Sequence, residues 1–355
     1  MKVLQFAAAT AVALALTTGS VFGQEIKLRM ATIDRETGTY WNNIAAPFAE
    51  LVGQLTNGRV EIEPLPAGSV GNIFKLYDAV SDGLVDMANV PPAFLGTKDP
   101  TNAMILAFPT GLGVDSFIPW LYLGGGENLL VQHRRETMNM FTMVTGSGPS
   151  ELFAHSHVPI RTVADLKGKK YRTLGNWAAI VRAKFGAVPT TVPGSEIYGM
   201  LEKKGLDLAE YSMPSENLAR GYNEIAKYII YPGIHASAWA FETVMTLENW
   251  AKLPPEVQRA MKIAARLVTY ESMNKIVNAD LDAMVKLQAG KNEWIKLDEK
   301  FKKDAQKGAR EWAMEVSAKA KAEGNPWPEK VAKSIFAWQD RWQANSRYLV
   351  MDFRD

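Results

Sequence analysis

The sequence of 355 residues contains no cysteine. Disulfide bonds, thiol nucleophiles and thiolate metal sites are therefore excluded. A chain without disulfides depends on a packed core for its stability, and a hydrophobic content of 47% over this length is sufficient to build one. The length favours two domains.

The sequence also lacks a strong charge of either sign. Its formal net charge is +2, which becomes +1 without Lys2, the single charged residue among the first 23. Recognition of nucleic acid requires a clustered basic surface, so we expect no nucleic-acid partner. The motifs GxSxG, HExxH and the Walker loop, which mark common hydrolases and nucleotide-binding proteins, are also missing. We therefore do not expect an enzyme.

Apolar runs long enough to cross a membrane are missing too. The run 6–16 is too short, because a membrane-spanning helix needs about 20 residues. Lys2 precedes this run and small residues follow it, which is typical of a secretory signal peptide. We predict that residues 1–23 are removed near Gly23 and Gln24 and that the mature protein is periplasmic.

Residues 24–148 alternate between strand and helix patterns and form the first predicted lobe. The expected strands are 26–32, 59–65 and 84–90, and the expected helices are 42–55 and 73–82. Such βαβ units form a largely parallel sheet, which binds ligands at the carboxyl ends of its strands. This places Trp41 and Phe94 on the ligand side. Residues 103–141 are expected to be a loop with one helix near 127–135.

Residues 149–235 repeat the alternation and form the second predicted lobe. The expected strands are 151–155, 169–174, 188–192 and 206–210, and the expected helices are 178–185, 196–203 and 216–228. Residues 236–253 are predicted to return to the first lobe as a strand and crossover. The two lobes are expected to meet near 148–151 and again near 235.

Residues 254–355 have a helical pattern. Apolar residues recur every three or four positions at Val257, Met261, Ala264 and Val268, which predicts a long helix over 254–287. Two further helices are expected at 298–323 and 328–347. The predicted fold is an α/β clamp of two lobes with a long bracing helix and a helical C-terminal tail.

Arg172 is the first candidate for ligand binding. It stands at the end of a predicted strand, before a strand-to-helix turn, where its planar guanidinium could hold a carboxylate with two hydrogen bonds. An ordinary surface arginine on an edge strand fits the local pattern equally well. The other strand-end and turn residues of this series include two carboxylates, an amide and several aromatics, which suit a small polar ligand: Glu151, Glu210, Tyr211, Asn176, Trp177 and Trp239.

Two other functions are open at this point. His155 and His157 could present two imidazoles from one face of a strand to zinc, as in a metal-binding receptor. Glu151 and Glu210 could serve as a carboxylate pair for acid–base hydrolysis.

Four short motifs in a fixed order indicate a family. They are Arg59-Val-Glu-Ile with Pro66-Ala-Gly68, Asp78-Ala-Val-Ser-Asp-Gly83 with Asp86, Asp165-Leu-Lys-Gly-Lys-Lys-Tyr-Arg172, and Leu206-Asp-Leu-Ala-Glu210. On these motifs the chain resembles the extracytoplasmic solute-binding proteins of TRAP transporters, the DctP-like family, over nearly all of its mature length. The resemblance implies a clamp that closes on a small organic acid and delivers it to a membrane permease. It also implies that Arg172 holds the substrate carboxylate, so we expect Arg172→Ala to lose binding while the fold melts normally.

Within this family the chain is most similar to members that bind 2-oxo acids. The similarity rests on Ala209-Glu-Tyr211, Pro214, Asn217 and Tyr231-Pro-Gly233. It implies a 2-oxo or 2-hydroxy acid as ligand and one cation, sodium or calcium, between the ligand carboxylate and the protein, without an organic cofactor. The implied metal ligands are Glu210, Glu151 and Tyr211, and the implied substrate-binding residues are Arg172, Glu151, Asn176, Tyr211, Trp41, Phe94 and Trp239.

Two departures from that subgroup bear on the cation. Glu151 stands where a glutamine is common, and Ala236 stands where the subgroup places a second acidic ligand. The exchange either preserves the number of carboxylates or indicates a cationic ligand without a metal. Subgroup members also dimerise through a swapped C-terminal helix, which implies a possible homodimer through 328–347.

Overall fold

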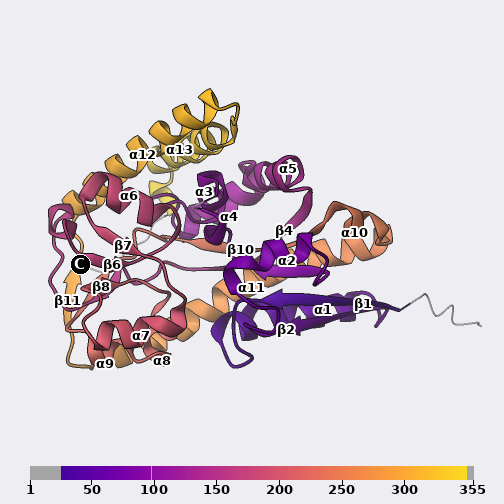
Figure 1. Cartoon of the computed structure of the whole chain (residues 1–355), viewed down its shortest axis with the longest axis horizontal. Coiled ribbons are helices and arrows are strands. Elements are labelled where there is room, and N and C mark those ends of the chain that lie inside the picture. Colours follow the sequence, from indigo (N-terminus) through magenta and orange to yellow (C-terminus); the bar gives the residue numbers. More distant parts are fainter. Residues whose placement is uncertain (1–24, 97, 350–355) are drawn as a thin grey trace, which may run out of the picture.

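Two sheets, one in each of two lobes, organise the chain (Figure 1). The computed structural model describes residues 25–96 and 98–349, so the expected signal peptide lies outside the described residues. No helix in the described part combines the length and the hydrophobicity that crossing a membrane requires. The prediction of a two-lobed α/β fold is confirmed.

The first sheet has the strand order β2-β1-β3-β10-β4. Its strands are β1 (Ile26–Thr32), β2 (Val60–Leu65), β3 (Met87–Val90), β4 (Met140–Gly148) and β10 (Trp239–Thr246). As the βαβ pattern predicts, β1 is parallel to β2 and β3, whereas β10 is antiparallel to β3 and β4.

The second sheet has the strand order β11-β9-β5-β8-β6-β7. Its strands are β5 (Ala154–Ser156), β6 (Lys170–Arg172), β7 (Val188–Thr190), β8 (Leu208–Ala209), β9 (Tyr228–Tyr231) and β11 (Glu293–Lys296). β6 is parallel to β7 and β8, but β5 is antiparallel to β8 and β9. Both sheets are therefore mixed and not largely parallel.

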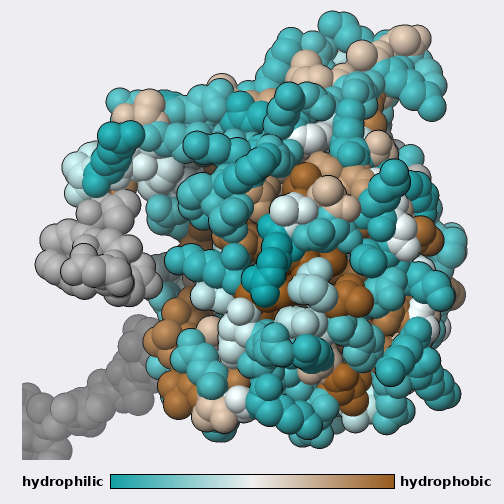
Figure 2. Space-filling model, turned by 90° about the vertical axis from the view of Figure 1, so that its left-hand side faces the viewer, coloured by the Kyte–Doolittle hydropathy of each residue, from teal (hydrophilic) through white to brown (hydrophobic). Residues whose placement is uncertain are grey.

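The helices cover both lobes (Figure 1). They are α1 (Ala46–Leu55), α2 (Leu76–Ser81), α3 (Pro100–Ala107), α4 (Val114–Leu123), α5 (Gly126–Met138), α6 (Gly175–Phe185), α7 (Gly194–Glu202), α8 (Pro214–Ala219), α9 (Tyr222–Ile225), α10 (Leu247–Lys252), α11 (Pro255–Gln288), α12 (Glu299–Ala322) and α13 (Trp327–Asn345). A π-helical turn, Trp41–Ala45, precedes α1, and 3-10 turns occupy Ile73–Lys75, Pro92–Leu95, Val163–Leu166 and Arg347–Leu349. Seen from the side of the second lobe, the surface is mostly hydrophilic, with hydrophobic residues visible near its middle and toward its lower edge (Figure 2).

Three segments of the chain connect the lobes. β4 ends at Gly148 and β5 begins at Ala154, while β9 ends at Tyr231 and β10 begins at Trp239. The third segment is α11, whose 34 residues follow β10 and α10 and precede β11 of the second sheet. At about 1.5 Å per residue this helix is about 50 Å long, which suits its course along both lobes (Figure 1).

The predicted long helix is confirmed almost residue for residue. Val257, Met261, Ala264 and Val268, whose spacing predicted it, are all buried. The two C-terminal helices are confirmed as α12 and α13 within about three residues at each end.

The prediction of a long loop over 103–141 is wrong. The region holds α3 and α4 before the expected helix α5, and the nine residues of β4, which the pattern did not indicate, follow it. Every residue of β4 is buried, so the polar–apolar alternation of a half-exposed strand is missing. Six of the eight residues of α3 are buried as well, which removes the helical period in the same way.

The predicted helix 216–228 is also wrong in its extent. The segment forms two short helices, α8 and α9, and then enters strand β9. Gly221 separates the helices with a φ of 71°, a left-handed conformation that ends the first helix. β11, which joins the edge of the second sheet beside β9, was not expected either.

The C-terminal helix α13 packs on its own chain. It contacts α3, α4, α5 and α12, and Trp327, Val331 and Ile335 are buried in these contacts. The Trp338 indole N–H donates to the Ser116 carbonyl oxygen at 3.2 Å, and the Gln339 amide donates to the carbonyl oxygen of Thr110 at 2.8 Å.

Asp280 of α11 forms a hydrogen bond to the start of α8, but its buried charge lowers the stability of the folded protein. Its Oδ1 accepts a hydrogen bond from the Ser215 N–H at 2.9 Å. Burial raises the pKa of this carboxyl from 3.8 to about 6, although the bond from Ser215 opposes the shift. The folded protein therefore binds this proton more tightly than the unfolded chain, so stability is lost as the pH rises from about 4 to 6.

Replacing Asp280 with asparagine is expected to stabilise the protein by about 1 kcal/mol above pH 7, because the amide oxygen keeps the bond to Ser215 without a buried charge. Urea unfolding of both proteins at pH 7.5 and at pH 5 measures the difference. The gain should shrink at the lower pH, where the wild-type carboxyl is protonated. An equal gain at both pH values would contradict this account.

Candidate functional site

A cavity of about 710 Å³ lies between the two lobes. Residues of the first lobe that line it include Asp34, Tyr40 and Phe94, and residues of the second include Arg172 and Glu210. Its size fits a small ligand with room for water or an ion.

Arg172 lines this cavity from the end of β6 and is only 2% exposed. β6 and β8 are parallel, with Arg172 beside Ala209, so their carboxyl ends bring Arg172 and Glu210 together. Arg172 Nη1 donates to the Glu210 carbonyl oxygen at 2.7 Å and to Glu210 Oε2 at 3.2 Å. The surface-arginine interpretation of Arg172 is therefore wrong.

The guanidinium of Arg172 is largely engaged by the protein. Besides the two bonds to Glu210, Nε and Nη2 donate to the Val192 carbonyl oxygen at 3.2 and 2.9 Å. These bonds involve four of the five guanidinium N–H groups and leave one N–H of Nη2 for a ligand. The expected two-bond grip on a carboxylate is therefore not preformed.

Glu210 is held in one orientation by two neighbours. Oε1 accepts a hydrogen bond from the Leu174 N–H at 3.1 Å, just before α6, and Oε2 faces Arg172. The side chain is almost fully buried. Its carboxylate is thus fixed at the cavity wall, where its position depends on both β6 and β8.

Glu151 and His235 come together through the backbone. Glu151 forms an isolated β-bridge with Gly233, and its N–H donates to the Ala236 carbonyl oxygen at 3.1 Å. The side chains meet with 2.9 Å between Glu151 Oε2 and His235 Nε2. Two segments that lead into and out of the second lobe therefore supply one pair of polar side chains.

The protonation of this pair follows from its burial and its charges. Burial raises the pKa of Glu151, and the hydrogen bond from His235 opposes that shift. Burial alone would lower the pKa of His235, but the bond to Glu151 and the charges of Glu210 and Glu151 outweigh it and raise that pKa. The imidazole therefore retains its proton to a higher pH than an ordinary histidine.

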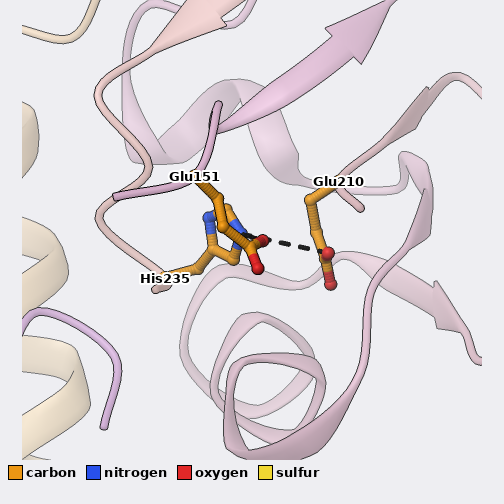
Figure 3. Close-up of side chains that lie close together, drawn as sticks. All are labelled: Glu151, Glu210 and His235. Carbon is orange, nitrogen blue, oxygen red and sulfur yellow. Dashed lines mark hydrogen bonds and ion pairs between the residues drawn. The ribbon is translucent and has the colours of Figure 1, made fainter. Parts of the chain in front are cut away.

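Glu151, Glu210 and His235 form a compact group of donor atoms. One ligand atom of each lies within 4.8 Å of the others, and His235 Nε2 is 3.9 Å from Glu210 Oε2. Figure 3 shows Glu151 and His235 side by side, with the Glu210 carboxylate facing them. Two carboxylates and an imidazole are donors that metal cations accept. Among the described residues this is the one group of three such side chains that could hold a metal ion.

His235 is a site residue that the sequence analysis missed. The family resemblance drew attention to the next residue, Ala236, because it places an acidic ligand there. The available signal was the turn Tyr231-Pro-Gly233 after a strand, which leads the following residues into the space between the lobes.

Most of the other candidate residues lie at the wall of the cavity. Asn176, Tyr211, Phe94 and Trp239 line the cavity, as does Trp177. The Asn176 amide donates to the Pro100 carbonyl oxygen at 3.2 Å, and the Tyr211 ring lies 4.5 Å from the Arg220 guanidinium carbon. Their roles in binding stay predictions.

Trp41 is not among the residues that line the cavity, and its role in binding stays a prediction. The neighbouring Tyr40 lines it, and its hydroxyl is 2.7 Å from Ser212 Oγ. Trp41 begins the π-helical turn Trp41–Ala45 that precedes α1.

The two histidines of the zinc hypothesis do not line the cavity. His155 is buried in β5 against the Tyr222 ring, and burial lowers its pKa to about 3. His157 Nε2 lies 2.9 Å from the Leu201 carbonyl oxygen. Neither belongs to a group of three potential metal ligands among the described residues. The geometry does not support a zinc receptor built on this pair.

Hydrogen bonds join the two lobes close to the cavity. Thr39 Oγ1 of the first lobe donates to Glu216 Oε2 of the second at 2.6 Å, and Tyr40 meets Ser212 nearby. Asp34 accepts the Tyr40 N–H at 2.9 Å, and burial together with the charge of Glu216 raises the pKa of Asp34. The two lobes are thus in direct hydrogen-bonded contact beside the candidate site.

A family comparison identifies the class of protein. The sequence model of the bacterial extracellular solute-binding proteins, family 7 (DctP), matches residues 30–319, which is most of the chain. The chain belongs to this family. The family consists of solute-binding proteins and not of enzymes, so the hydrolase that would use Glu151 and Glu210 is excluded.

Known relatives agree with this family 7 assignment. A monocarboxylate 2-oxoacid-binding periplasmic protein of Nostoc sp. is 28% identical over 316 residues, which cover 88% of this chain and 86% of the relative. The 2,3-diketo-L-gulonate-binding periplasmic protein YiaO of Escherichia coli is 25% identical and covers 77% of this chain and 83% of its own length.

Solved structures of TRAP solute-binding proteins share the fold of this solute-binding protein. One from Bordetella bronchiseptica, a dimer with calcium and picolinate in one of its sites, has a TM-score of 0.84 and 24% identity and covers 92% of this chain and 96% of its own. One from Pseudoalteromonas atlantica, with bound sodium and pyruvate, has a TM-score of 0.84 and 22% identity over 92% and 97% of the two chains. At these identities the likeness establishes the two-lobed fold.

Proposed function

We propose that this protein captures a small organic acid, a 2-oxo or 2-hydroxy carboxylate, and delivers it to the membrane subunits of a TRAP permease. The observation that carries the proposal is the group Glu151, Glu210 and His235 beside Arg172, inside the cavity between the lobes. The Nostoc relative, named for 2-oxo acids, supports this ligand class, as does the pyruvate in the Pseudoalteromonas structure.

The charges of this group favour a bound cation. Arg172 is already paired with Glu210 at 3.2 Å, and His235 with Glu151 at 2.9 Å. The four groups together therefore offer an anionic ligand no net positive charge. A divalent cation held by the two carboxylates would displace the His235 proton and leave one net positive charge for the ligand carboxylate, whereas a monovalent cation would supply that charge only with His235 still protonated.

The donor set also bears on which cation binds. Carboxylate oxygens suit the calcium or sodium found in the related structures, whereas an imidazole nitrogen suits zinc and other transition metals. Glu151, Glu210 and His235 would be the ligands from this chain, with Tyr211 beside them at the cavity wall.

The ligand would be held by few polar contacts and several apolar ones. The remaining Nη2 N–H of Arg172 can donate to the carboxylate, and Asn176 lines the same wall. Phe94 and Trp239 face the cavity and would cover the apolar part of a short acid. Closure of the lobes through Thr39 and Glu216 would exclude water and strengthen these contacts.

Two further features complete the proposed receptor. Residues 1–23 act as a signal peptide that directs the protein to the periplasm. A homodimer through 328–347 would require α13 to exchange between two chains and to form on the partner the contacts that it makes here with α3, α4, α5 and α12.

Titration calorimetry with pyruvate tests the proposed function. Chelator-treated mature protein in a sodium-free buffer should bind pyruvate at least about tenfold more weakly than after addition of sodium, calcium or zinc. The cation that restores binding identifies the metal. Equal binding with and without every cation would contradict the metal role, and binding of a cationic solute in place of pyruvate would favour the metal-free alternative.

A further inference from the structure

The cavity between the lobes is larger than pyruvate requires. Its volume is about 710 Å³, whereas the six non-hydrogen atoms of pyruvate fill on the order of 180 Å³ if each takes about 30 Å³, the share of one water molecule in the liquid. The remaining space can hold a longer ligand. Three charged side chains that line the cavity have no ligand role in the site described above: Asp34, Arg35 and Arg220. The bonds that they can form therefore bear on which longer acid the cavity accepts.

Arg220, the residue that follows α8, is engaged by the protein at one nitrogen. Its Nε donates to Oε1 of Glu216, one helical turn earlier, at 2.7 Å. Nη1 and Nη2 form no hydrogen bond of normal length to a described residue, although the Tyr222 hydroxyl is near. The side chain is 16% exposed, and both nitrogens remain accessible. Arg220 therefore presents up to four N–H groups to a ligand or to water in the cavity.

The Tyr211 ring places Arg220 beside Arg172. The guanidinium carbon of Arg220 lies 4.5 Å from the centre of this ring, and that of Arg172 lies 5.5 Å from it. The ring packs so closely on Gly194 that a Cβ atom there would overlap its edge, and the Tyr222 hydroxyl donates to the Gly194 carbonyl oxygen at 3.1 Å. Both arginines thus belong to one packed wall. With about 2.9 Å for each hydrogen bond, an acid of roughly four to six carbons reaches from one guanidinium to the other.

The charges around Arg220 cancel. Arg220 is paired with Glu216, and Arg35 is matched by its neighbour Asp34. A second carboxylate on the ligand would gain no net attraction here and would lose its hydration. A hydroxyl group carries no charge and can accept a hydrogen bond from Nη1 or Nη2 of Arg220. Asp34 can accept the hydroxyl proton in turn, because its Oδ1 and Oδ2 retain acceptor capacity beside their bonds from the N–H groups of Arg35 and Tyr40 at 2.9 Å.

We propose that Arg220 is a specificity-determining residue of this cavity and that it donates a hydrogen bond to a distal hydroxyl group of an acid of roughly four to six carbons. The carboxylate of the same ligand lies at Arg172. The inference rests on the proposed capture of a 2-oxo or 2-hydroxy acid and narrows that class to acids with a distal hydroxyl. An acid without this group leaves the Arg220 N–H groups unpaired, and sites that bond a ligand oxygen reject such analogues strongly.

Titration calorimetry with two pairs of acids tests the role of Arg220. Each pair consists of an acid and its analogue with a terminal hydroxyl: 2-oxobutanoate with 4-hydroxy-2-oxobutanoate, and 2-hydroxyhexanoate with 2,6-dihydroxyhexanoate. In the wild type, with the cation that supports pyruvate binding present, the hydroxylated member of one or both pairs should bind at least about tenfold more tightly. Equal affinities within both pairs overturn the proposal.

A double variant removes the guanidinium without leaving a buried charge. Arg220→Met alone would leave the Glu216 carboxylate unpaired, so the test uses Glu216→Gln, Arg220→Met, with Glu216→Gln alone as its matched control. The double variant should lose the preference for the hydroxylated acid, whereas the control should keep it. A change in lobe closure affects both members of a pair equally, so the ratio of their affinities reports on Arg220. A preference that survives in the double variant overturns the proposal.

Two further comparisons separate this inference from the proposed function. A distal carboxylate replaces a methyl group in 2-oxoglutarate relative to 2-oxopentanoate, and a gain of affinity from this change without any gain from a hydroxyl would overturn the hydroxyl assignment. Binding of pyruvate without a preference for the hydroxylated acids overturns the role of Arg220 alone. If no acid, including pyruvate, binds with any cation, the proposed function fails and this inference fails with it.

Discussion

Replacing Glu210 with glutamine is expected to weaken pyruvate binding by at least about 100-fold at a saturating concentration of the cation identified for the wild type. The Glu210 carboxylate faces Arg172 and lies within 4.8 Å of donor atoms from Glu151 and His235. The amide keeps the size of the side chain but removes the negative charge that would hold the cation. Titration calorimetry measures the affinity.

Stability separates this effect from misfolding. The amide oxygen of a glutamine at 210 can still accept the Leu174 N–H, so the midpoint of thermal unfolding without ligand should change little. Glu202→Gln removes an exposed carboxylate of α7 and should bind pyruvate as the wild type does. If Glu210→Gln binds pyruvate within a few-fold of the wild type, Glu210 is not a metal ligand.

Replacing Arg172 with alanine is expected to lower the affinity for pyruvate by at least about 100-fold and, in addition, to destabilise the fold by about 2–3 kcal/mol. The loss of binding follows from removal of a buried positive side chain at the cavity wall. The loss of stability follows from the buried carbonyl oxygen of Glu210 and the half-buried one of Val192, which both lose their donors. Calorimetry and urea unfolding measure the two quantities separately.

This second effect corrects the expectation that Arg172→Ala melts normally. An arginine that only meets the ligand would be dispensable for the fold, but Arg172 also links β6 to Val192 and Glu210. Arg182→Ala, on the exposed side of α6, is the control and should change neither quantity. Unaltered pyruvate affinity in Arg172→Ala would contradict the carboxylate role.

The sequence was sufficient to predict the helices and strands that have one buried face and one exposed face. α11 buries Val257, Met261 and Ala264 on one side, so its helical period was visible, and α12 and α13 follow the same rule. The same reasoning failed where both faces are covered. β4 and α3 are buried almost throughout, so the periods that distinguish strand from helix are absent from their sequences.

Part of the candidate site was also accessible to sequence analysis. Arg172 and Glu210 end neighbouring parallel strands, β6 and β8, and the rule that such ends share one edge of a sheet brings them together. Pattern alone left Arg172 open between a surface charge and an anion-binding residue. Its engagement with Glu210 and Val192 depends on the register of β6 and β8 and on the loop after β7.

The sequence by itself thus determined the number of lobes and the bracing helix, because these depend on local periodicity and on the order of strands. Together with the family motifs it also pointed to Arg172, Glu210 and Glu151 as site residues. Only the tertiary structure showed that His235 joins them. His235 and Glu151 are 84 positions apart and meet through a backbone bridge between Glu151 and Gly233. No local pattern encodes such a contact, since it arises where two connecting segments pass each other between the lobes.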